Sequence, residues 1–418
     1  MKKFADRLPH SATRSATSST THERTTRGPG PALFAMALGG LAIGTTEFAS
    51  MGLLPAFAAD LGASVPEAGT AISAYALGVV VGAPALAVLG ARWPRKRLIL
   101  ALAAALALAN LASAFAPTFG AFVATRFLAG LPHGAYFGTA SVLAASLVPR
   151  ERRPRAIATV MSGLMIANVV GVPGATWLGQ SAGWPAAYVA VAAISLVTMA
   201  AVWWLVPDVR SEQRGSIVGE LSALRRGQVW ITMAVIATGF GGSFAVYSYI
   251  TPVLTEVSGL AESAVPLALA VFGIGMTLGN QVGGRLAEIA PVRTIAAGLG
   301  SATVAMAVFA LTAASAVTAL VALFALAFTT TATTPALATR LMDAGREGPT
   351  LGAALHHAAF NVSNAIGAAL GGVVLAAGWG WTAPAAVATV LPLMGLAALA
   401  VAVRMERTEH RRDLALAA

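Results

Sequence analysis

Long apolar runs separated by short polar segments follow one another along most of this 418-residue chain. A helix that crosses a bilayer needs about 20 mostly apolar residues, and twelve stretches reach that length. Their apolar residues run on continuously, whereas the strands of a membrane β-barrel alternate apolar and polar residues. The pattern therefore predicts an all-α integral membrane protein. Its twelve transmembrane helices are expected at 32–54, 69–91, 98–116, 119–147, 156–179, 185–206, 229–255, 263–287, 294–313, 316–341, 350–376 and 381–404.

Charge is scarce and unevenly placed along the chain. Only 11% of the residues are charged, against about 25% in soluble proteins. If the helices alternate in direction, 26 of the 27 Lys and Arg residues fall on one side of the membrane. Cytoplasmic loops carry the excess of Lys and Arg, so both termini are predicted to be cytoplasmic. The net charge of +10 is therefore attributed to topology and not to nucleic-acid binding.

The spans divide six and six around a polar stretch, 207–228, which is expected to be a cytoplasmic linker. The two halves, 32–206 and 229–404, are almost equal in length. Asn168 in the fifth span and the Gly183-Trp184 pair that follows this span recur as Asn361 in the eleventh and Gly378-Trp379 after it. This repetition predicts two pseudo-symmetric six-helix bundles, with chance similarity between Gly/Ala-rich helices as the alternative. Residues 1–31 and 405–418 are expected to be cytoplasmic tails, the first of them disordered.

Several short motifs carry a resemblance to a known family. The first is a basic loop after the second span, in which Ala91 and Pro94 stand where the family has Asp and Gly. Its members are Arg92, Arg95, Lys96 and Arg97, and its counterpart in the second half contains Arg285 and Glu288. The fourth span holds Arg126 four residues before Gly130. The fifth holds a Gly/Pro motif of Gly171, Pro173 and Gly174, in which Val172 interrupts the usual order.

From Ala32 to Arg404 the chain resembles a major facilitator superfamily transporter of the twelve-span drug:proton antiporter type. The segment from Gly44 to Pro55 is similar to the branch of arabinose-efflux-like permeases and actinomycete chloramphenicol exporters. The resemblance implies a multi-pass protein of the bacterial plasma membrane. It also implies a central cavity lined by spans one, four, seven and ten, and a role for the motif residues in conformational change.

Three ionisable residues well inside predicted spans are candidates for proton coupling: Glu47, Arg126 and His133. A charged side chain at a helix centre costs about 2.5–3.5 kcal/mol on insertion scales, so such residues usually face a cavity or a partner. Desolvation favours the neutral form of Glu47, which is what a proton carrier requires. The alternatives are a structural Glu47 bonded to nearby Thr side chains, an Arg126 that pins neighbouring helices, and a His133 that only packs.

A cavity for amphiphilic molecules should be mostly apolar with a few polar groups. The predicted substrate-binding residues are Phe48, Met51, Tyr136, Phe244, Tyr247, Tyr249, Asn361 and Asn364. For each aromatic residue the alternative is packing against lipid. The pair His356-His357 is interpreted as structural, since two histidines without a third ligand make a poor metal site.

These observations predict a proton-coupled secondary transporter that exports small hydrophobic or zwitterionic compounds, with a chloramphenicol-like antibiotic as the leading candidate. The alternative within the same fold is a sugar or metabolite permease. An enzyme or receptor is not expected, because no long soluble segment is evident, and the chain has no Walker-type phosphate loop. No cofactor or metal is expected beyond the proton gradient. The expected partners are a small-molecule substrate, protons and the lipid bilayer, and the protein is expected to be a monomer.

Overall fold

The computed structural model describes residues 28–90, 92–208, 223–344 and 349–417. Within these ranges the chain is helical and forms no strand. Eleven of its helical segments are long and apolar enough to cross a membrane. A twelfth, α5 (Phe119–Ser146), has 28 residues but is less apolar because it contains Arg126, Pro132 and His133. The predicted fold class is confirmed. The predictions for residues 1–27 and 209–222 lie outside the described residues.

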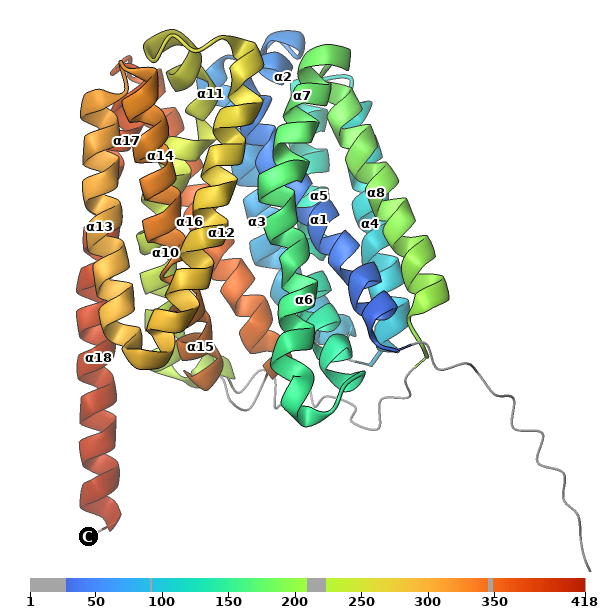
Figure 1. Ribbon diagram of the computed structural model, residues 1–418, viewed down its shortest axis with the longest axis vertical. Coiled ribbons are helices and arrows are strands. Elements are labelled where there is room, and N and C mark those ends of the chain that lie inside the picture. Colours follow the sequence, from blue (N-terminus) through green and yellow to red (C-terminus); the bar gives the residue numbers. More distant parts are fainter. Residues whose placement is uncertain (1–27, 91, 209–222, 345–348, 418) are drawn as a thin grey trace, which may run out of the picture.

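The helices form two bundles that lie side by side (Figure 1). The first contains α1 (Gly30–Gly52) with its continuation α2 (Leu54–Asp60), α3 (Val65–Gly90), α4 (Arg95–Ala114), α5, the fifth span of α6 (Arg153–Ile166), η2 (Ala167–Gly171) and α7 (Val172–Ala182), and α8 (Trp184–Leu205). The second contains α10 (Gly227–Ser248) with α11 (Ile250–Pro252) and η4 (Val253–Val257), α12 (Val265–Ile289), α13 (Pro291–Thr312), α14 (Ala316–Thr331) with α15 (Thr334–Ala344), α16 (Pro349–Ala376), and α17 (Ala383–Ala388) with α18 (Val390–Ala417). Helix α18 runs on through most of the predicted tail 405–418.

The two bundles meet at two main contacts. Helix α16 packs along α3 and α5, and α12 packs against η2 and α7. At the second contact the backbones touch, because a Cβ atom added to Gly273 would lie 2.1 Å from the carbonyl oxygen of Asn168. The element η2 is a π-helical turn, a feature often found at functional sites. It lies at the start of the predicted Gly/Pro motif, whereas α16, the corresponding helix of the second bundle, is continuously α-helical.

A pair of equivalent hydrogen bonds relates the two bundles. Trp184 Nε1 at the start of α8 donates to Asp60 Oδ2 (2.8 Å), and Trp381 Nε1 before α17 donates to Glu256 Oε2 (3.0 Å). The glycines before the two tryptophans, Gly183 and Gly380, both have φ +87°. The equivalent of Trp184 is therefore Trp381. The sequence comparison paired it with Trp379, which is 67% exposed. That pairing was wrong by two residues.

The ends of the bundle differ in charge. We call the end that carries Arg92–Arg97, Arg150–Arg155, Arg225–Arg226, Arg285 and Arg293 the basic end, and the end that carries Asp60, Glu67, Glu256 and Glu262 the acidic end. Figure 1 shows the C-terminus of α18 projecting from the basic end. At the acidic end the bundles are joined by hydrogen bonds from Thr251 Oγ1 to the Gly52 carbonyl (3.1 Å) and from Gln180 Nε2 to the Glu262 carbonyl (2.9 Å).

Candidate transport site

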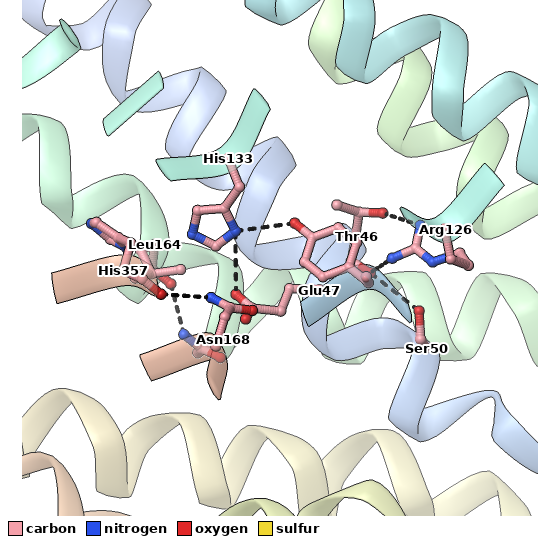
Figure 2. Close-up of polar contacts among 10 residues, drawn as sticks. Thr46, Glu47, Ser50, Arg126, His133, Leu164, Asn168 and His357 are labelled. Atoms are coloured by element: carbon pink, nitrogen blue, oxygen red, sulfur yellow. Dashed lines mark hydrogen bonds and ion pairs between the residues drawn. The ribbon is translucent and has the colours of Figure 1, made fainter. Parts of the chain in front are cut away.

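Glu47 lies in the last part of α1 with only 3% of its surface exposed. Its Oε2 atom is 3.9 Å from His133 Nδ1 on α5 (Figure 2). The amides of Asn364 and Asn361 on α16 are near enough to interact with the same carboxyl. Glu47 Oε1 and both amide atoms of Asn364 nevertheless lack a regular hydrogen-bond partner among the described residues. The carboxyl therefore lies where α1 and α5 of one bundle meet α16 of the other.

Arg126 is held by the residue before Glu47. Its Nη1 atom donates to Thr46 Oγ1 and its Nη2 atom to the Thr46 carbonyl, both at 2.9 Å. The guanidinium carbon lies 4.7 Å from the ring centre of Tyr75 and 5.0 Å from that of Tyr188. Asn110 completes this group by accepting a hydrogen bond from the Thr46 hydroxyl. The guanidinium, which cannot lose its charge, is thus solvated by hydroxyl, carbonyl and aromatic groups.

His133 lies nearly two turns after Arg126 on α5 and faces Glu47. Its Nδ1 atom is 3.2 Å from the Tyr75 hydroxyl as well as 3.9 Å from Glu47 Oε2. Its Nε2 atom has no hydrogen-bond partner among the described residues. Leaving such a buried group unpaired costs about 1–3 kcal/mol. The atoms around Glu47 that lack partners are therefore suited to receive a proton, a water molecule or a polar group of a ligand.

An aromatic cavity of about 20 Å³ adjoins this polar cluster. Phe48, the residue after Glu47, forms one wall, where its ring centre lies 6.2 Å from that of Phe244 and 5.9 Å from that of Tyr247. The rest of the lining comes from the second bundle: Phe240, Ser243, Phe272, Met276, Ala327, Thr330, Thr331 and Phe360. The cavity is mostly apolar, as small-molecule sites are.

Only some of the predicted substrate-binding residues line this cavity. Phe48, Phe244 and Tyr247 do. Met51 is buried in the adjoining core, Tyr136 donates to the Met36 carbonyl (2.9 Å), and Tyr249 donates to the Ala368 carbonyl (2.8 Å) at the acidic end. Asn361 and Asn364 face Glu47 instead.

The predicted motif residues occupy two kinds of position. At the basic end Arg92, Arg97, Arg285 and Glu288 are exposed, Arg95 is half-buried, and Lys96 Nζ lies 5.8 Å from the ring centre of Trp203. Inside the bundle, a Cβ atom on Gly130 would lie 2.1 Å from the Tyr75 carbonyl oxygen and one on Gly171 would lie 2.2 Å from Thr45 Oγ1. Pro173 is the second residue of α7, and a Cβ atom on Gly174 would meet nothing within 4 Å.

Sequence reasoning missed several residues of the site. Tyr75, Asn110 and Tyr188 surround Arg126, and Phe272 and Phe360 line the cavity, but each reads as ordinary packing in an apolar stretch. His357 was interpreted as structural, yet its ring centre lies 5.3 Å from that of His133. Within the described ranges, no group of three or more His, Cys, Asp or Glu residues is arranged to hold a metal ion.

Several known proteins resemble this chain in sequence. The model of the Major Facilitator Superfamily matches residues 36–353. The chain is 37% identical to the inner membrane transport protein YdhP of Escherichia coli (strain K12), over 84% of this chain and 90% of YdhP. It is 31% identical to AraJ of the same organism over 90% and 96% of the two chains, and 34% identical to a chloramphenicol resistance protein of Streptomyces lividans over 84% and 89%.

A solved structure has the same fold. It is a bacterial homologue of the human lysosomal transporter Spinster, with a TM-score of 0.70 and 16% identity over 90% of this chain and 97% of that one. The family match and the identities to full-length relatives confirm the resemblance seen in the sequence motifs. This chain belongs to the Major Facilitator Superfamily and is a membrane-embedded transporter.

Proposed function

We propose that the protein is a proton-coupled exporter of small hydrophobic or zwitterionic compounds, which it exchanges for protons by alternating access. The observation that carries this proposal is the buried Glu47 carboxyl, placed between the two bundles and one residue before Phe48, which lines the aromatic cavity. In this account the basic end faces the cytoplasm of a bacterial cell, because Lys and Arg accumulate on that side.

The environment of Glu47 supports a role in proton transfer. Intramembrane carboxyl groups are costly and mark ion or proton pathways. Arg126 does not form an ion pair with Glu47 among the described residues, since its Nη1 and Nη2 atoms donate to Thr46. The carboxyl is therefore left free to gain and lose a proton, while Arg126 fixes the backbone next to it.

The cavity lining supports an apolar substrate. Three of its four hydroxyl groups bond within the protein: Ser243 and Thr330 lie 2.8 Å apart, and Thr331 donates to the Met276 carbonyl (3.0 Å). A sugar would leave its own hydroxyls without partners against such a wall, at a cost of about 1–3 kcal/mol for each unpaired group. The chloramphenicol resistance protein among the relatives makes chloramphenicol the first compound to test.

The small size of the cavity supports alternating access. A volume of about 20 Å³ holds one water molecule, whereas drug-sized ligands occupy sites of about 300–1,000 Å³. The cavity wall combines Phe48 of the first bundle with residues of the second. Substrate entry therefore requires the bundles to move apart.

The test uses everted membrane vesicles that contain the protein, are acidified inside and carry a pH-sensitive dye. Chloramphenicol and a panel of sugars are added separately. An exporter of the proposed kind takes chloramphenicol into the lumen as protons leave, so the lumen becomes more alkaline. If sugars evoke the response and chloramphenicol does not, the protein is a sugar permease. Chloramphenicol uptake with no proton movement would contradict the proton coupling.

A further inference from the structure

Three histidines form a continuous group between Glu47 and the basic end. The ring centres of His133 and His357 are 5.3 Å apart, and those of His357 and His356 are 5.8 Å apart. His133 lies on α5 of the first bundle, whereas the other two lie on α16 of the second. The group thus crosses the contact between the bundles.

The three histidines lie closer to the basic end than Glu47 does. At 1.5 Å per residue, Glu47 lies about 26 Å along α1 from its basic end at Gly30, and His133 lies about 20 Å along α5 from Ser146. By the same measure His357 lies only about 12 Å along α16 from Pro349. The side chains therefore bridge much of the distance between the buried carboxyl and the basic end.

Aromatic contacts hold the histidine rings in place and leave some of their nitrogen atoms without a hydrogen-bond partner. The His357 ring stacks on Phe137 with ring centres 4.7 Å apart and planes at 6°. His133 packs edge-on against the same Phe137 ring (5.4 Å). Yet His133 Nε2, His356 Nδ1 and Glu47 Oε1 have no hydrogen-bond partner among the described residues. Neutral imidazole has one donor and one acceptor nitrogen, so rings this close can pass a proton directly or through one water molecule.

The remaining polar groups around the histidines do not replace them as carriers. Tyr75 on α3 approaches His133 Nδ1 at 3.2 Å, and Arg126 on α5 is engaged with Thr46. Neither a tyrosine nor an arginine readily gives up a proton near neutral pH. The titratable group on α1 that faces His133 is Glu47 itself.

The opposite route is closed in this structure. At the acidic end the Tyr249 ring fills the space beside Gly371, where an added Cβ atom would lie 2.5 Å from Cε2, and beside Gly69, where one would lie 2.0 Å from the hydroxyl. Thr251 joins the bundles at the same end. The histidines therefore lead from Glu47 toward one side of the membrane only.

We propose that His133, His357 and His356 carry the coupling proton between Glu47 and the basic end while the two bundles remain in contact. The inference rests on the proposed function. It extends that function by giving the proton an exit that is too narrow for substrate. Glu47 then loses its proton before the basic end opens, and no continuous path across the membrane is formed.

The test compares wild-type protein with His357→Phe and His357→Gln in proteoliposomes. Phenylalanine preserves the stack on Phe137, and glutamine preserves hydrogen bonding, but neither side chain titrates. The matched control is His410→Gln, which removes a histidine from α18 beyond the last span. Two rates are measured with radiolabelled chloramphenicol. The first is uptake driven by a proton gradient. The second is the exchange of chloramphenicol across the membrane with equal pH on both sides, which needs no net proton transfer.

We expect both His357 variants to lose at least tenfold in driven uptake and to keep the wild-type exchange rate, with the control unchanged. Driven uptake at the wild-type rate in both variants would overturn the relay. An equal loss of driven uptake and exchange in folded variants would also overturn it, since it would assign His357 to packing. A wild type that exchanges chloramphenicol but shows no uptake driven by a proton gradient would contradict the proposed function itself, and the relay with it.

Discussion

Arg126 donates two hydrogen bonds of 2.9 Å to Thr46 and, among the described residues, forms no ion pair with its neighbour Glu47. Arg126 of α5 therefore contacts α1 at Thr46, whereas the Glu47 carboxyl leaves α1 on a different face. Arg126 fixes the helix between the rings of Tyr75 and Tyr188, while the carboxyl faces His133 and the second bundle.

The replacement Arg126→Lys should destabilise the protein. Lysine cannot donate to the Thr46 hydroxyl and carbonyl in the same forked geometry, and it loses the planar contact with the two tyrosine rings. We expect a loss of about 2 kcal/mol in unfolding free energy, the scale of one hydrogen bond to a charged group. Thermal unfolding in detergent measures it. The control is Arg285→Lys at the exposed basic end, which should leave the melting temperature unchanged. Equal melting of both variants would show that the Thr46 contacts contribute nothing.

Two glycines of the predicted motifs should respond oppositely to alanine. Gly130→Ala places a Cβ atom 2.1 Å from the Tyr75 carbonyl oxygen, so α3 and α5 must separate, and we expect a loss of about 1–3 kcal/mol. Gly174→Ala meets nothing within 4 Å and removes a flexible residue from a helix, so it should be neutral or stabilising by up to about 1 kcal/mol. Detergent melting curves of the two variants decide this. Similar destabilisation by both would refute the close packing of α3 and α5.

The equivalent tryptophans should contribute unequally to stability. Trp184→Phe loses the bond to Asp60 in a buried aromatic cluster, where its ring lies 5.2 Å from Phe122, and should cost about 1.5–3 kcal/mol. Trp381→Phe loses the matching bond to Glu256 at a more exposed site and should cost less. The unfolding temperatures of the two variants provide the comparison. A larger loss in Trp381→Phe would contradict this assignment of burial.

The aromatic wall should determine apparent affinity for an apolar substrate. Phe244→Ala removes a ring that contacts both Phe48 and Phe360 around the cavity. The lost burial is worth about 1.5–3 kcal/mol, so we expect the KM for chloramphenicol uptake to rise at least tenfold. Phe115→Ala, at a residue that is 75% exposed, is the control and should transport normally. An unchanged KM in Phe244→Ala would remove this cavity as the substrate site.

The sequence predicted the fold class well because the length of each apolar run is set by bilayer thickness. It also singled out Glu47, Arg126 and His133, since an ionisable residue in an apolar stretch is conspicuous. It could not predict their partners. Thr46 and Asn110 are ordinary polar residues in sequence, and Phe272 and Phe360 are indistinguishable from lipid-facing aromatics. The contact of His357 with His133 depends on how α5 meets α16, which no local pattern specifies.

The most direct test of the account replaces Glu47 with Gln, which keeps the shape and hydrogen bonding of the side chain but removes its titration. Everted vesicles with an acidic lumen and a pH-sensitive dye receive chloramphenicol, with Glu67→Gln at the exposed acidic end as the control. The account predicts that wild type and the control release protons from the lumen on addition of chloramphenicol, and that Glu47→Gln does not. Proton release at the wild-type rate by a folded Glu47→Gln variant would contradict it.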